Sequence, residues 1–228
     1  PERKSRVISD AEKAIIAYHE GGHAIVQRIL PKCDPVSKVT IISRGMALGY
    51  TMALPQEDRY LQSKTEFEDK IAGLLGGNVA ERMIFGDTTT GASNDIEKAT
   101  DLARRMVTEF GMSDKLGPLS FGKRDEMVFL GRSMGEQRDY SDEVARTIDE
   151  EVRAIIDRAY ERATEVLTTH RDKLIALAEK LVAEETVDSE GFEALFSDLP
   201  AKEDVHGIPT IVGPGQPIPV PDANPQPA

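Results

Sequence analysis

Two histidines flank a glutamate and two glycines in the run His19-Glu20-Gly21-Gly22-His23. Residues four apart lie on the same face of a helix, so both imidazoles are expected to reach one metal ion. Glu20 projects at a different angle, which leaves its carboxylate free to act on water instead of binding the metal. The pattern H-E-x-x-H is typical of a hydrolytic zinc site. We therefore predict Zn²⁺ bound by His19 and His23, with Glu20 as the general base.

A catalytic zinc site needs a third protein ligand, because it usually combines three side chains with one open position. The extended metzincin pattern would place Gly at position 26 and His at position 29, where Val26 and Ile29 stand, so that class is excluded. Of the remaining histidines, His206 borders a proline-rich tail and His170 lies between two predicted helices. A carboxylate is therefore favoured as the third ligand.

Three acidic residues downstream are candidates for this ligand: Glu81, Asp87 and Asp95. Glu81 fits a site in which a glutamate on a second helix completes the metal ligands. Asp95 follows a glycine-containing loop and falls in a first helical turn, where acids are also common because they complement the helix dipole. The residues alone favour Asp95 and Glu81 equally and Asp87 less.

The composition limits the classes of function. The formal net charge of -12 argues against nucleic acid as a ligand, since phosphate binding requires a basic face. The single cysteine, Cys33, excludes an internal disulfide and fits a reducing compartment. No apolar run approaches the roughly 20 residues that span a bilayer, so we expect no direct membrane insertion by this chain. Because the chain begins with Pro1 and not with Met, we expect it to be a fragment of a longer protein.

Hydrophobic spacing and capping residues predict the elements that position the site. We expect a first helix from the N-cap Ser9 to Pro31, and its two interior glycines imply that another element approaches it closely. Extended segments are predicted at 36–43 and 50–54. Helices are predicted from a capping box of Thr65 with Glu68 to Gly86, from Ser93 or Asn94 as N-cap to Phe110, and over 141–169, 174–183 and 189–196.

The predicted fold is mainly α, with a small sheet of two or three strands beside the metal-binding helix and a helical C-terminal region. Residues 1–7 are interpreted as a linker and residues 8–200 as a zinc peptidase domain, helical from about residue 141. Residues 201–228 are interpreted as a disordered tail, because seven of the thirteen prolines follow Gly207.

Several runs, in order along the chain, resemble the protease domain of the FtsH family of membrane-anchored AAA zinc metalloproteases. The resemblance covers about residues 8–196, which makes it far more specific than H-E-x-x-H alone. The runs are Ala17-Tyr18-His19-Glu20-Gly21-Gly22-His23-Ala24, Thr40-Ile41-Ile42-Ser43-Arg44-Gly45-Met46-Ala47-Leu48-Gly49, Leu75-Gly76-Gly77-Asn78-Val79-Ala80-Glu81, Thr90-Gly91-Ala92-Ser93-Asn94-Asp95, Phe110-Gly111-Met112-Ser113 and Phe129-Leu130-Gly131-Arg132.

The resemblance implies a zinc endopeptidase whose metal ligands are His19, His23 and Asp95, with Glu81 in a packing or supporting role. It also implies polypeptide substrates, namely unfolded or damaged proteins delivered by an AAA ATPase module. In the full-length protein it implies a homo-hexamer at the cytoplasmic face of the cell membrane. This chain carries no G-x-x-x-x-G-K-[ST] phosphate-binding loop, so the ATPase module is absent from it.

Two positions depart from the family pattern. Alanine is common in the family where Gly21 stands, and a second acid often follows Glu81, where this chain has Arg82. A different class of function is a non-catalytic helical assembly module, forming a hexamer and binding zinc structurally. The helices predicted over 141–196 carry apolar stripes suited to assembly. A scaffold that had lost catalysis would be expected to lose Glu20 or a ligand, and none is missing.

Overall fold

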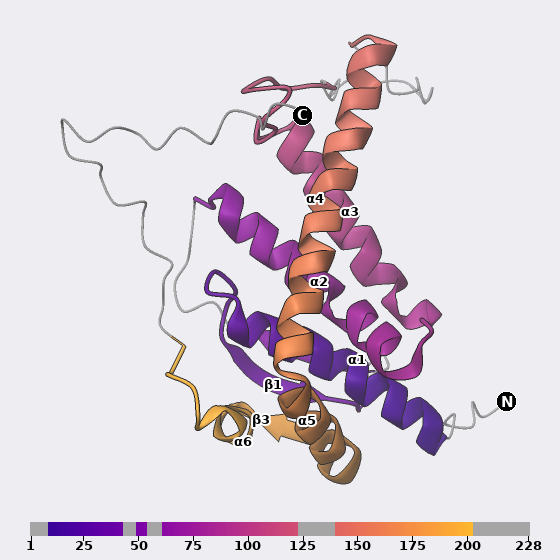
Figure 1. Cartoon of the computed structure of the whole chain (residues 1–228), viewed down its shortest axis with the longest axis vertical. Coiled ribbons are helices and arrows are strands. Elements are labelled where there is room, and N and C mark those ends of the chain that lie inside the picture. The colour runs from indigo at the N-terminus through magenta and orange to yellow at the C-terminus, as the bar shows by residue number, and fades with distance from the viewer. Residues whose placement is uncertain (1–8, 43–48, 54–60, 123–139, 203–228) are drawn as a thin grey trace, which may run out of the picture.

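The computed structural model describes residues 9–42, 49–53, 61–122 and 140–202 (Figure 1). These residues form a mostly helical fold with one small antiparallel sheet, as predicted. The elements in chain order are α1 (Asp10–Ile29), β1 (Val36–Thr40), β2 (Tyr50–Ala53), α2 (Lys64–Phe85), the 3-10 turn η1 (Thr90–Ala92), α3 (Ser93–Thr108), α4 (Asp142–Thr169), α5 (Arg171–Glu184), β3 (Thr186–Asp188), α6 (Ser189–Glu193) and η2 (Ala194–Phe196).

Helix α1 begins where the sequence predicts. The Ser9 side chain accepts a hydrogen bond from the backbone N–H of Glu12, and the Glu12 carboxylate accepts one from the backbone N–H of Ser9. This reciprocal capping satisfies donors that a helix N-terminus otherwise leaves unpaired. The helix ends at Ile29, just before Pro31. The face that carries the H-E-x-x-H run is buried.

Helix α2 corrects one predicted cap. Its capping box is formed by Ser63 and Glu66, not by Thr65 and Glu68, so the helix begins two residues earlier than predicted. Two overlapping patterns of hydroxyl and glutamate three apart occur here, and the spacing alone does not distinguish them. The predicted end of the helix is confirmed, because Gly86 adopts a left-handed conformation with φ 72°.

Helices α1 and α2 cross at a point where neither carries a side chain. A β-carbon placed on Gly22 would lie 2.3 Å from the carbonyl oxygen of Gly76 and 2.6 Å from the β-carbon of Ala80. A β-carbon on Gly76 would meet the carbonyl oxygen of Gly22 at 2.7 Å. The predicted close approach to the glycines of α1 is therefore confirmed, and it brings α2 against the histidine-bearing face.

The sheet has the order β2-β1-β3, with both pairs antiparallel. The sequence predicts β1 and β2 but not β3, which comes from the segment between α5 and α6 and pairs Val187 with Val39. Only three residues make β3, too few for an alternating pattern to be recognised. Strand β1 ends at Thr40, before the predicted end at residue 43. Positions 43 and 54, the last residues of the two predicted strands, lie outside the described residues.

The C-terminal helices follow the prediction closely. Helix α4 begins after the N-cap Ser141 and packs across α2 and α3, and α5 packs on α1 (Figure 1). Helix α3 corrects a second cap: its N-cap is Ala92, with no side-chain hydrogen bond, and neither Ser93 nor Asn94 takes that role. The turn η1 precedes α3 directly, and the Thr89 side chain caps it instead.

The core is largely aliphatic, as the absence of tryptophan implies. Arg28 fastens the C-terminal segment to α1: it donates hydrogen bonds to Glu193 and to the carbonyl oxygen of Pro200, and lies 5.0 Å from the ring centre of Phe196. Within the described ranges, no helix is both long enough and apolar enough to cross a bilayer. The predicted linker at 1–7 and nearly all of the tail at 201–228 lie outside those ranges.

Candidate metal centre

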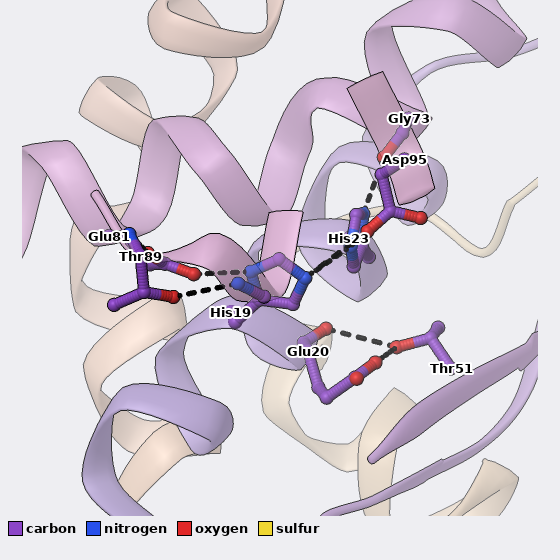
Figure 2. Close-up of polar contacts among 9 residues, drawn as sticks. His19, Glu20, His23, Thr51, Gly73, Glu81, Thr89 and Asp95 are labelled. Carbon is purple, nitrogen blue, oxygen red and sulfur yellow. Dashed lines mark hydrogen bonds and ion pairs between the residues drawn. The ribbon is translucent and has the colours of Figure 1, made fainter. Parts of the chain in front are cut away.

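The structure brings His19, His23 and Asp95 together between α1, α2 and α3 (Figure 2). The Nε2 atoms of the two histidines lie 3.1 Å apart. Asp95 Oδ2 lies 3.4 Å from each of them. Both histidines are buried, and Asp95 is partly exposed in the first turn of α3. In the part of the chain that the structure describes, this is the one group of metal-binding residue types found to converge.

The hydrogen bonds on the far side of each ring define which nitrogen carries the proton. His23 Nδ1 faces the carbonyl oxygen of Gly73 at 2.8 Å, and a carbonyl only accepts. His19 Nδ1 faces Glu81 Oε1 at 2.7 Å, and an ionised carboxylate also only accepts. In the neutral rings both protons therefore sit on Nδ1. Two Nε2 lone pairs then converge with a carboxylate oxygen, an arrangement that attracts a cation.

The spacing of these three atoms fits a tetrahedral ion. Zinc bonds to nitrogen and oxygen of about 2.0–2.1 Å place neighbouring ligand atoms about 3.3–3.4 Å apart in a tetrahedral site. The observed separations are 3.1 and 3.4 Å. Gly77 on α2 leaves space for the two imidazole rings, because a β-carbon there would lie 2.6 Å from both His19 Cε1 and His23 Nε2. The residues present therefore fit a zinc ion.

Glu81 lies beside this cluster and is not part of it. Its side chain is buried on α2, with 1% of its surface exposed. One carboxylate oxygen accepts the hydrogen bond from His19, and the other accepts a bond of 2.6 Å from the backbone N–H of Thr89. Burial opposes ionisation of this carboxylate, but the hydrogen bonds from His19 and Thr89 outweigh it and lower its pKa. Glu81 thus joins a histidine on α1 to the loop that leads to Asp95.

The other candidates for a third ligand lie elsewhere. Asp87 is exposed and accepts a hydrogen bond from the backbone N–H of its neighbour Thr88. His170 lies at the junction of α4 and α5, and it does not belong to the cluster. His206 lies outside the described residues. The two carboxylates that the sequence left equal are therefore separated by position, Asp95 towards the Nε2 atoms and Glu81 towards Nδ1.

Glu20 points from α1 towards β2, on another side of the helix from Glu81 (Figure 2). It is buried, with 7% of its surface exposed, and its Oε2 accepts a hydrogen bond of 2.8 Å from the Thr51 hydroxyl. Burial raises the pKa of this carboxyl, while His23 and Thr51 act in the opposite direction. A buried carboxylate with a raised pKa accepts a proton more readily, which is the property that a general base needs.

The cluster carries more negative than positive charge. Burial tends to lower the pKa of His19, but hydrogen bonds to Asp95 and Glu81 raise it to about 9. Burial tends to raise the pKa of Asp95, and its contacts with His19 and His23 lower it well below the usual range. A zinc ion bound at Nε2 of His19 would replace the proton that these carboxylates attract to the ring.

The family model for peptidase family M41 matches residues 6–195 of the chain. The chain belongs to peptidase family M41. This membership confirms the resemblance seen in the ordered motifs. The M41 chain is 58% identical over 191 residues to an "ATP-dependent zinc metalloprotease FtsH" of Pseudothermotoga lettingae, which covers 83% of the chain and 30% of that relative.

Two further relatives carry equivalent names. The M41 chain is 56% identical over 214 residues to "ATP-dependent zinc metalloprotease FtsH 1" of Sphaerobacter thermophilus, covering 94% of the chain and 32% of the relative. It is 54% identical over 197 residues to "ATP-dependent zinc metalloprotease FtsH" of Bacillus subtilis, covering 86% and 31%. The chain therefore spans about a third of the length of the curated relatives it matches.

Four residues near the M41 site were not predicted to act there: Gly73, Gly77, Thr51 and Thr89. Gly73 and Thr89 contact the site through backbone groups, which residue types do not reveal. The pair Gly76-Gly77 inside a predicted helix was a usable signal, because glycine is costly there unless something lies close. Thr51 gave no signal, since threonine is common in any strand.

Proposed function

We propose that this chain is the zinc-dependent endopeptidase module of a membrane-anchored ATP-dependent protease. The observation that carries the proposal is the convergence of two buried Nε2 atoms and a carboxylate oxygen beside a buried glutamate. In this assignment His19, His23 and Asp95 hold the metal and Glu20 is the general base. Membership of family M41 and the names of the relatives support the choice of metal and of reaction.

A zinc ion held by these residues supplies Lewis acidity, which acidifies water and polarises a peptide carbonyl. Glu20 accepts the proton of the attacking water and delivers it to the departing nitrogen. Glu81 and the Gly73 carbonyl keep the histidine rings oriented through their Nδ1 protons. The roles are therefore divided among the side chains, since the two rings and Asp95 bind the metal, Glu20 moves the proton, and Glu81 orients a ring.

Unfolded or damaged polypeptides are the proposed substrates. Strand β2 pairs on one side with β1, and within the described residues no strand pairs with its other edge. Pairing of an extended peptide with such an edge uses backbone groups and does not depend on sequence. Thr51 of this strand also contacts Glu20, which places the edge strand at the proposed general base. An edge of this kind suits a protease that accepts many sequences.

The assembly of the whole protein is proposed from the relatives, whose names describe ATP-dependent enzymes. An AAA ATPase module joined to this one would deliver the substrates. The full-length protein would form a homo-hexamer at the cytoplasmic face of the cell membrane. The alternative of a helical assembly module with structural zinc explains the apolar faces of α4 and α5, but it gives Glu20 no role. Family membership favours the enzyme.

The direct test is cleavage of a fluorescently labelled polypeptide by the zinc-loaded chain, with a permanently unfolded substrate chosen so that no unfolding step is needed. We expect cleavage to stop after zinc is removed with a chelator and to return when one equivalent of zinc is added. Removal takes away the ion that the converging donors hold. The product peptides are measured by mass spectrometry. Cleavage that persists in the zinc-free protein would contradict the proposal.

The assignment of the third ligand has its own test. Asp95→Ala is expected to weaken zinc binding at least about 100-fold, because it removes a metal ligand. Glu81→Ala is expected to weaken it about 10- to 100-fold, because it only releases the His19 ring. Asp87→Ala is the matched control and should bind zinc normally. Affinity is measured by competition with a chromophoric chelator. Loss of zinc from Glu81→Ala together with retention by Asp95→Ala would reverse the assignment.

A further inference from the structure

The carboxylate of Glu20 is held on the side of β2 by two residues of one short segment. Oε2 accepts the hydrogen bond of 2.8 Å from the Thr51 hydroxyl. On the other side, a β-carbon placed on Gly49 would lie 2.8 Å from the carbonyl oxygen of Thr40 and 3.0 Å from both Oε1 and Cγ of Glu20. The absence of a side chain at Gly49 therefore leaves clearance for strand β1 and for the Glu20 carboxylate. The segment 49–51 thus encloses the carboxylate that the proposed reaction uses.

We propose that Thr51 is the positioning residue for Glu20: its hydroxyl fixes the carboxylate, and strand β2 thereby sets the place of the general base. This inference rests on the proposed function. Glu20 is buried, and among the described residues Thr51 is the side chain that donates a hydrogen bond to its carboxylate. The Glu20 side chain has three rotatable bonds, and this hydrogen bond favours one of its rotamers.

A hydroxyl suits this position because it both donates and accepts. The Thr51 Oγ1 atom lies 2.8 Å from Glu20 Oε2 and 3.1 Å from the backbone carbonyl oxygen of Glu20. When the carboxylate is ionised, the hydroxyl donates to Oε2. When Glu20 holds the proton taken from water, it donates to Oγ1, and the hydroxyl proton turns to the carbonyl. The contact is therefore kept at both stages of the proton transfer.

The location of Thr51 gives this contact a second consequence. Strand β2 is at the edge of the sheet, and the proposed substrate strand pairs with that edge. Thr51 then contacts the general base, and the strand that carries Thr51 contacts the substrate backbone. A shift of β2 along its pairing with β1 would move the Glu20 carboxylate with it. The position of the bound peptide relative to the Glu20 carboxylate is thus set by one strand, β2.

The test compares Thr51→Val, which removes the hydroxyl and keeps the shape, with Thr51→Ser, which keeps the hydroxyl. Steady-state cleavage of an unfolded peptide should show kcat about 10- to 100-fold lower for Thr51→Val, because a misplaced reacting group costs a factor of this size. KM and bound zinc should change less than about twofold. Thr51→Ser should recover kcat to within about threefold of the parent.

Thr40→Val is the matched control for loss of a threonine hydroxyl in the same sheet. The Thr40 hydroxyl contacts Glu185 and Thr186 and makes no contact with Glu20. It should lower the melting temperature and leave kcat unchanged. A parental kcat in Thr51→Val, or an equal loss of kcat in Thr51→Ser or Thr40→Val, would overturn the role of Thr51.

A crystal structure of zinc-loaded Thr51→Val separates this inference from the proposed function. The Glu20 carboxylate should leave its position between residues 49 and 51. If it keeps that position, Thr51 does not hold it, whatever the activity. Absence of cleavage by the parent chain would contradict the proposed function alone, because the position of the carboxylate is read from the structure and not from the rate.

Discussion

Glu20→Gln should reduce kcat for cleavage of an unfolded polypeptide about 10³-fold and leave bound zinc unchanged. The amide cannot accept the proton of the attacking water, and general acid–base groups contribute about 10²–10⁴-fold to rate. Zinc is retained because the proposed ligands are His19, His23 and Asp95. The Thr51 hydroxyl still finds an acceptor in the amide oxygen, so the surroundings are preserved. Single-turnover kinetics and metal analysis measure the two effects separately.

The matched control is Glu97→Gln, the same change on an exposed residue of α3 two positions after Asp95. It alters the net charge near the site equally and should leave kcat within about twofold of the parent. Undiminished cleavage by the Glu20 variant would exclude Glu20 as the base. A loss of the same size in the Glu97 variant would assign the effect to charge alone.

Gly22→Ala is expected to lower the free energy of unfolding by about 2 kcal/mol, the largest effect on stability that we predict from a single methyl group. The added carbon would lie 2.3 Å from the carbonyl oxygen of Gly76, which is backbone and cannot rotate away. Overpacking of this kind costs about 1–3 kcal/mol and occasionally more. The helix propensity of alanine returns only about 1 kcal/mol. Urea denaturation, monitored by circular dichroism, measures the change.

Gly21→Ala is the control, since it adds the same methyl group one residue earlier in α1. Its nearest neighbour is Leu174 Cδ1 at 3.1 Å, the end of a flexible side chain. The variant should be as stable as the parent or up to about 1 kcal/mol more stable. Equal stabilities for the two variants would show that the crossing of α1 and α2 tolerates a wider separation.

Capping residues and hydrophobic spacing predicted most of the helices, and the H-E-x-x-H run predicted the part of the site that lies on α1. Ser9, Gly86 and Ser141 mark helix ends through bonds to neighbouring residues, and they act as predicted. The two wrong caps, at Thr65 and at Ser93 or Asn94, show where local patterns are ambiguous: several capping residues stand close together and only the completed fold chooses among them. Strand β3 was missed because its partner, β1, lies nearly 150 residues earlier.

The sequence by itself determined that two imidazoles and a glutamate share one helix, because a spacing of four residues is a property of the helix alone. It did not decide between Asp95 and Glu81 as the third ligand. The tertiary structure places Asp95 at the Nε2 atoms and Glu81 at Nδ1 of His19. That difference arises from the crossing of α1 and α2 at their glycines and from the loop that Glu81 holds through Thr89. Distances between elements depend on how they pack, and packing is not encoded in any single run of residues.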